Sequence, residues 1–65
     1  MNVLIVGLGL MGGAYAYRLS KKGYNVYGVD KNANAIDYAI NNGYIISGGD
    51  NPKDYILNAD LIILS

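Results

Sequence analysis

The chain has 65 residues, a formal net charge of zero, and neither cysteine nor histidine. These absences exclude disulfides, thiolate nucleophiles and zinc–cysteine sites, and they remove the commonest general base. The charges are balanced and scattered, so no basic stripe is available for a nucleic-acid backbone. The apolar start is short and lacks a basic lead-in, unlike a membrane span or secretory signal. We therefore expect a soluble, cytoplasmic protein that binds neither nucleic acid nor membrane.

The first three predicted elements are a strand, a helix and a strand. Residues 3–6 form an unbroken β-branched and leucine run, which is typical of a strand buried on both faces. Residues 11–22 keep apolar and small side chains at helical spacing, and Gly23 provides a left-handed stop. Residues 25–29 predict a second short strand, which Asp30 closes.

The next segment predicts a second helix and a weaker strand. Asn32 can cap a helix over residues 33–41. Residues 44–47 predict a strand, and the two glycines and aspartate at 48–50 predict a turn.

The last elements are a short helix and an apolar strand. Asn51 followed by Pro52 fits a helix N-cap with proline at the first helical position, in a helix that ends near residue 58. Residues 61–64 repeat the apolar character of the first strand. Strands that alternate with helices predict a doubly wound α/β fold with a parallel sheet. Right-handed crossovers then give the strand order 3-2-1-4.

A glycine-rich loop joins the first strand to the first helix. The segment matches G-x-G-x-x-G and consists of Gly7, Leu8, Gly9, Leu10, Met11 and Gly12. This motif is weak alone, but here it follows a buried strand, opens a helix and precedes an acidic residue by about 20 positions. We expect Gly7 to form the tight turn, Gly9 to let a diphosphate approach the backbone, and Gly12 to allow close helix packing. The alternative is a strand-to-helix turn without a ligand.

Asp30 predicts which dinucleotide the loop would hold. A carboxylate at the end of the second strand can accept hydrogen bonds from the adenosine ribose hydroxyls, and it would repel a 2′-phosphate. NAD is therefore favoured over NADP, although Lys31 could partly offset a phosphate. Asp30 could instead cap the following helix or lie in solvent at the end of the strand. Gly13 lowers helix propensity by ~1 kcal/mol against alanine, which suggests close packing there.

The segment 4–13, LIVGLGLMGG, resembles the opening of prephenate dehydrogenases, especially in its doubled glycine. Residues 42–45 and 59–65 are also similar to that family, so the resemblance covers the chain. Ala14 and Tyr15 depart from it, because the family commonly has serine and leucine there. The 3-hydroxyisobutyrate and 6-phosphogluconate dehydrogenases share a comparable start, and they are the second family group that the chain resembles.

The resemblance implies a Rossmann-type domain whose loop binds NAD and whose Asp30 binds the adenosine ribose. A typical domain has ~150 residues, so residues 1–65 would be an incomplete, truncated domain that is inactive alone. The resemblance implies catalytic groups outside this chain, in a domain that binds prephenate for NAD-linked oxidative decarboxylation to 4-hydroxyphenylpyruvate on the tyrosine pathway. No residue of this chain is assigned a catalytic or metal-binding role, and we expect a homo-oligomer.

Two other classes remain open at this point. A non-catalytic module could use the same loop to sense a nucleotide. Flavoproteins and methyltransferases share a glycine-rich first turn, but flavoproteins more often carry glutamate where Asp30 stands.

Overall fold

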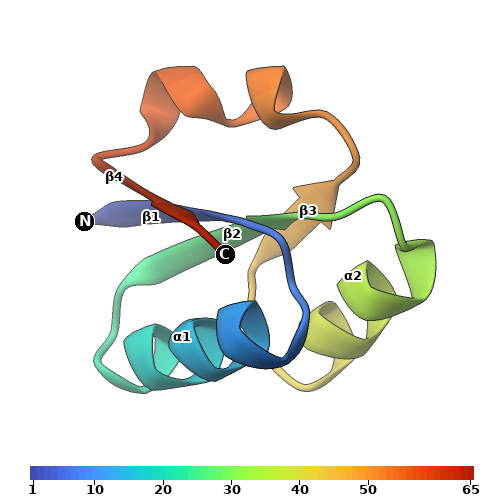
Figure 1. Ribbon diagram of the computed structural model, residues 1–65. Helices are drawn as coiled ribbons and strands as arrows, with labels where there is room; N and C mark the ends of the chain where they lie inside the picture. The colour runs from blue at the N-terminus through green and yellow to red at the C-terminus, as the bar shows by residue number, and fades with distance from the viewer.

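Four parallel strands form one sheet in the order β3-β2-β1-β4 in the computed structural model, which describes residues 1–65 (Figure 1). In chain order the elements are β1 (Asn2–Val6), α1 (Leu10–Lys21), β2 (Asn25–Val29), α2 (Ala33–Asn41), β3 (Ser47–Gly49), the 3-10 helices η1 (Pro52–Asp54) and η2 (Ile56–Asn58), and β4 (Leu61–Leu64). β1 pairs in parallel with both β2 and β4. The predicted doubly wound α/β fold and its strand order are therefore confirmed.

The hydrophobic core is built around β1. Val3, Leu4 and Ile5 have no exposed surface, because β1 has a strand on each side and cover on both faces. The buried side chains of the core cluster are Val3, Ile5, Leu8, Ala16, Val26, Ile36, Ala39 and Ile45. The continuous apolar run in the sequence thus corresponds to the central strand, as predicted.

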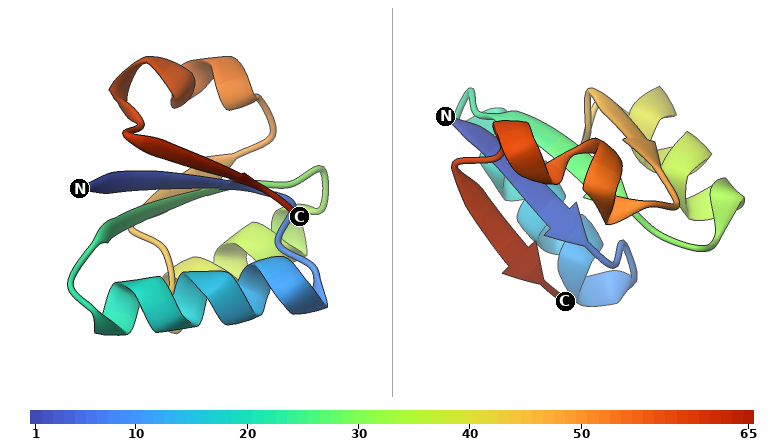
Figure 2. Two further views of the ribbon diagram at one scale, coloured as in Figure 1. Left: turned by 60° about the vertical axis from the view of Figure 1, so that its left-hand side comes forward. Right: turned by 90° about the horizontal axis from the view of Figure 1, so that it is seen from above.

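The two α-helices cover one face of the sheet, and the 3-10 helices lie over the other (Figures 1 and 2). α1 ends where Gly23 adopts a φ of +89°, the left-handed stop that the sequence predicts. Asn32 caps α2 by accepting a hydrogen bond from the Asn34 amide at 2.9 Å. The first two predicted helices are thereby confirmed. None of the helices is long and apolar enough to cross a membrane.

β3 lies later in the chain than predicted, so the assignment of residues 44–47 is wrong. The Tyr44 amide instead donates to the Ala39 carbonyl at 2.8 Å and closes the end of α2. Ile45 is buried in the core and is not a paired strand residue. The apolar residues that suggested a strand therefore join the helix to the sheet.

The glycines predicted as a turn at 48–50 contribute to β3 itself. A Cβ on Gly48 would lie 2.5 Å from the Gly28 carbonyl oxygen, so the two strands come together where a side chain would not fit. The Gly49 carbonyl then accepts a hydrogen bond from the Asp30 amide at 3.0 Å. This pairing fixes the end of β3 beside the end of β2.

The predicted helix over residues 52–58 is confirmed in its start and its end, but the segment forms two 3-10 helices and not one continuous helix. Asn51 does cap the start, with its side chain accepting from the Lys53 amide at 3.0 Å. Tyr55 then leaves helical geometry at φ −123° and ψ −20°, with its ring centroid 5.9 Å from that of Tyr27. Neither 3-10 helix buries a residue, so little packing stabilises a longer helix here.

Asn2 links the amino ends of three strands. Its amide donates to the Asp60 carboxylate at 2.8 Å, and its carbonyl accepts from the Asp60 amide at 2.8 Å. Its side chain donates to the Asn58 carbonyl at 3.1 Å and accepts from the Asn25 side chain at 3.0 Å. These contacts fix where β2 and β4 start relative to β1.

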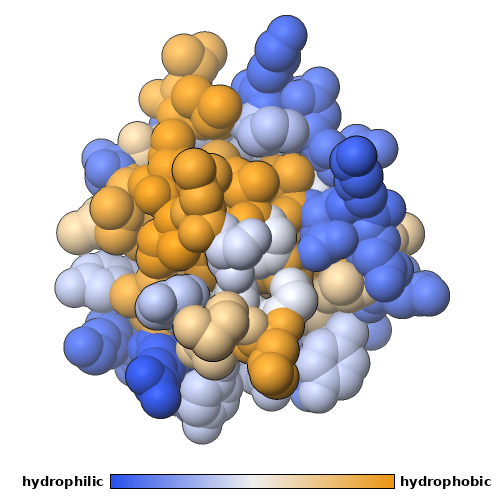
Figure 3. Space-filling view, viewed as in Figure 1, coloured by the Kyte–Doolittle hydropathy of each residue, from blue (hydrophilic) through white to orange (hydrophobic).

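β4 is an edge strand with an exposed apolar surface. Leu61 and Ile62 are 44% and 43% exposed, and Leu64 is 81% exposed. Leu57 of η2 is 92% exposed. Apolar side chains gather over β4 and η2 on the face shown in Figure 3.

Candidate functional site

The loop between β1 and α1 turns sharply at Gly7. Its φ is +99°, a conformation that residues with a side chain rarely adopt, and its amide donates to the Val29 carbonyl at 2.7 Å. A Cβ on Gly12 would overlap the Gly7 carbonyl oxygen, so the helix lies directly against the loop. The structure thus shows the tight turn at Gly7 and the close packing at Gly12.

Gly9 differs from these two glycines because the fold does not require it. Its φ is −68°, which any residue can adopt, and a Cβ added there would meet no atom within 4 Å. The backbone at Gly9 therefore faces open space. A ligand could approach it closely.

The start of α1 is open and uncapped. Gly9 is the N-cap residue of α1, and no side chain caps the helix. The first turn contains no acidic residue, and the Gly13 amide donates the first helical hydrogen bond, to the Gly9 carbonyl at 2.8 Å. The amides of the first turn precede any intrahelical acceptor. Leu10 is 94% exposed and Met11 is 63% exposed. The positive end of the helix dipole can therefore hold an anion.

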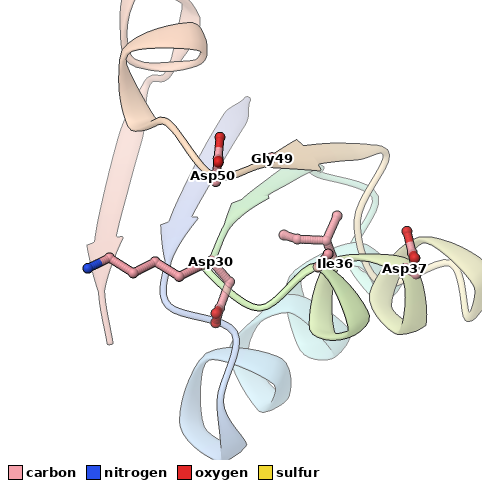
Figure 4. A pocket seen from close by; sticks show the side chains of 7 residues that line it. Asp30, Ile36, Asp37, Gly49 and Asp50 are labelled. Carbon is pink, nitrogen blue, oxygen red and sulfur yellow. The ribbon is translucent and has the colours of Figure 1, made fainter.

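Asp30 lies at the end of β2 and connects this loop to the start of α2. Its carboxylate accepts one hydrogen bond from the Leu8 amide and one from the Asn32 amide, each 2.8 Å long. Figure 4 shows the carboxylate pointing toward the loop between β1 and α1. The Asn32 amide, and next the Leu8 amide, stabilise the charged form and hold the pKa of Asp30 below its usual value, although partial desolvation opposes them.

These contacts bear on two predictions from the sequence, the binding role of Leu8 and the alternative capping role of Asp30. The Leu8 amide is already bound to Asp30, and the Leu8 side chain is buried in the core, so this residue offers neither group to a ligand. The alternative that Asp30 caps the next helix is confirmed in part, because its carboxylate accepts from the amide of Asn32, the N-cap residue of α2.

Two adjoining cavities lie beside Asp30. Their volumes are about 270 and 430 Å³, and both are lined by Asp30, Lys31 and Asp50. The smaller one extends to Asp37 of α2, and the larger one extends to Gly7 and Pro52. The site therefore combines an uncapped helix start with a cavity that is lined by three carboxylates and one ammonium group.

Sequence reasoning missed the position of Asp50 and misjudged Gly13. Asp50 follows β3 directly, so the shift in β3 brings it beside Asp30, and a correct strand assignment would have found it. A Cβ on Gly13 would meet only the Leu8 carbonyl oxygen, at 3.9 Å. The expectation of close packing at Gly13 is therefore wrong.

Comparison with solved structures shows similarity to dehydrogenases. A prephenate dehydrogenase from A. aeolicus, crystallised with hydroxyphenyl propionate and NAD⁺, is 37% identical with a TM-score of 0.85. An arogenate dehydrogenase from Synechocystis is 26% identical with a TM-score of 0.92, and a 3-hydroxyisobutyrate dehydrogenase from Salmonella typhimurium is 25% identical with a TM-score of 0.91. Each match covers 98% of this chain and only 22–23% of the solved chain. No curated protein matches the chain.

Both families that the sequence resembles are represented among these structures, so the resemblance is confirmed. The family model for the NAD binding domain of 6-phosphogluconate dehydrogenase matches residues 2–65. This match covers nearly the whole chain, including the glycine loop and the edge strand. The chain belongs to this family of NAD-binding domains.

Proposed function

We propose that the start of α1 binds the diphosphate of NAD. The observation that carries this proposal is Gly9, a glycine in open space at an uncapped helix start. Neither the φ of Gly9 nor packing requires a glycine there, whereas a diphosphate resting on the backbone does. The amides of Leu10, Met11 and Gly12 occupy the first helical turn and would donate to the phosphate oxygens.

The adenosine half is proposed to lie beside Asp30 and Lys31. A carboxylate offers about four acceptor positions, of which the backbone uses two, so the Asp30 carboxylate has capacity left for ribose hydroxyls. Asp37 and Asp50 share a cavity with Asp30. Three carboxylates would repel a 2′-phosphate, and Lys31 alone would attract it, which supports NAD over NADP.

We propose that the 65 residues are part of a larger NAD-binding domain in a dehydrogenase that acts on prephenate. The support is the 37% identity to a prephenate dehydrogenase together with the doubled glycine at Gly12 and Gly13. NAD, when bound, accepts a hydride at C4 of its nicotinamide. This chain would bind the adenosine diphosphate half of the cofactor. It contains no histidine, so a histidine general base would come from another part of the enzyme.

A second candidate is a 3-hydroxyacid dehydrogenase of the 3-hydroxyisobutyrate or 6-phosphogluconate type. The family match over residues 2–65 favours it. Initial rates of NAD reduction by the full-length enzyme separate the candidates. Prephenate should be oxidised with loss of CO2, whereas turnover of 3-hydroxyisobutyrate or 6-phosphogluconate alone would establish the second candidate.

The cofactor proposal is tested by Gly9→Ala. The added methyl group meets nothing in the free protein, so the chain should still fold, with a loss of stability of about 1 kcal/mol at most because alanine is a poorer N-cap than glycine. In the complex the methyl group blocks the diphosphate. We expect calorimetric titration to show NAD affinity falling by about tenfold or more, an effect of about 1.4 kcal/mol.

Gly13→Ala is the matched control, because it adds the same group one helical turn later at an ordinary contact distance. NAD affinity should then be retained. Equal affinity in wild type and Gly9→Ala would contradict the placement of the diphosphate.

A further inference from the structure

Asp30 forms a bridge between two segments that are far apart in the sequence. It accepts from Leu8, 22 positions earlier, and from Asn32, two positions later. Leu8 lies between Gly7 and Gly9, in the middle of the glycine loop. The carboxylate therefore ties that loop to the corner between β2 and α2.

Few other backbone hydrogen bonds restrain the loop near this point. The Gly7 amide is bound to Val29, and the next helical bond begins at Gly13. Between them, the Leu8 side chain is buried in the core and the Leu8 amide is bound to Asp30, and this bond fixes where the loop amide points. The bond is partly buried and involves a charged acceptor, so it is stronger than a neutral hydrogen bond in water.

We propose that Asp30 is a positioning residue for the diphosphate as well as a partner for the ribose. By holding the Leu8 amide, it orients the backbone at Gly9 and the amides that follow. This inference rests on the proposed function, because it concerns the same binding site. It adds that Asp30 contributes to the binding of ligands that have no ribose hydroxyls.

Two nucleotides separate the two roles of Asp30. ADP carries the diphosphate and both ribose hydroxyls, and 2′,3′-dideoxy-ADP keeps the diphosphate but lacks the hydroxyls. A residue that acts only on the ribose would affect ADP binding alone. We expect Asp30→Ala to weaken both ligands, with a loss of about tenfold for 2′,3′-dideoxy-ADP.

The titrations use the 65-residue chain, followed by calorimetry or amide chemical shifts. Asp54→Ala is the matched control, since Asp54 is a carboxylate of η1 that does not line the cavities beside Asp30. It should leave both affinities within about twofold. If Asp30→Ala weakens ADP and leaves 2′,3′-dideoxy-ADP unchanged, the positioning role is overturned and the proposed function stands. If wild type binds neither nucleotide, the proposed function itself fails.

A measurement on wild type keeps the inference testable if Asp30→Ala does not fold. The hydrogen-exchange rate of the Leu8 amide is measured with and without saturating ADP. We expect the amide to stay protected or become more protected in the complex, because the bond to Asp30 persists. Faster exchange in the complex would mean that the ribose displaces the amide, and it would overturn the positioning role.

Discussion

At the scale of single residues, the three glycines of the loop serve three separate requirements. Gly7 needs its positive φ, and Gly12 needs the space that a side chain would occupy. Gly9 needs neither, and the diphosphate that we propose to lie there would account for it. The single sequence motif therefore divides into two positions that the fold requires and one position that we propose for binding.

Asp30 should make stability depend on pH. Its folded pKa lies below the usual value because the Asn32 and Leu8 amides bind its charged form. Such a group stabilises the fold above its unfolded pKa, about 3.9, and the stabilisation is lost as pH falls through the folded pKa. We expect wild type to exceed Asp30→Asn in urea midpoint at pH 7, with the difference shrinking below about pH 4.

The control for this comparison is Asp54→Asn, which removes a carboxylate that accepts no amide of the glycine loop. Its midpoint difference from wild type at pH 7 should be smaller than that of Asp30→Asn. A difference between wild type and Asp30→Asn that stays constant from pH 7 to pH 3 would contradict the role assigned to these two hydrogen bonds.

Some residues of the candidate site could be predicted from the sequence, and others could not. Gly7, Gly9 and Asp30 stand at spacings set by the strand-loop-helix unit, so the sequence alone locates them. The bond from Leu8 to Asp30 depends on how two segments 22 positions apart meet, and no local signal encodes it. Asp50 was missed for another reason, because the strand before it was predicted too early in the chain.

At the scale of elements, prediction succeeded where local signals and burial agree. β1 has both a β-branched run and a fully buried position, and α2 has both a side-chain cap and a buried face. β3 has no such agreement, because its residues are Ser47, Gly48 and Gly49. Its position follows from the close approach of Gly48 to Gly28, which is a property of the neighbouring strand.

Asp60 gives a test of how the strands are aligned. Asp60→Ala removes the acceptor of the Asn2 amide at the start of β1. We expect the free energy of unfolding to fall by about 1 kcal/mol, the usual net value of one exposed hydrogen bond. Urea denaturation measures this loss. Asp54→Ala is the control and should change stability by less than about 0.5 kcal/mol, since it is an exposed residue of η1. Equal losses in the two variants would contradict the alignment role of Asp60.

At the scale of the whole molecule, the two sides of the sheet differ in how well they are covered. α1 and α2 pack against one face, while the 3-10 helices bury no residue on the other (Figure 2). β4 has a neighbour only on the β1 side, which leaves one row of its backbone groups unpaired. An open edge next to exposed apolar side chains favours association with another strand.

We expect the 65-residue chain to self-associate through β4, because pairing a second strand satisfies the open backbone groups and buries Ile62 and Leu64. Sedimentation velocity at increasing concentration should show dimers or larger species. Ile62→Lys places a charge at this edge and should shift the population toward monomer. Lys53→Ala, which removes a charge on η1 away from the edge, should not. A wild-type chain that stays monomeric at high concentration would show that the exposed edge is tolerated, and the apolar surface over β4 would then not cause association.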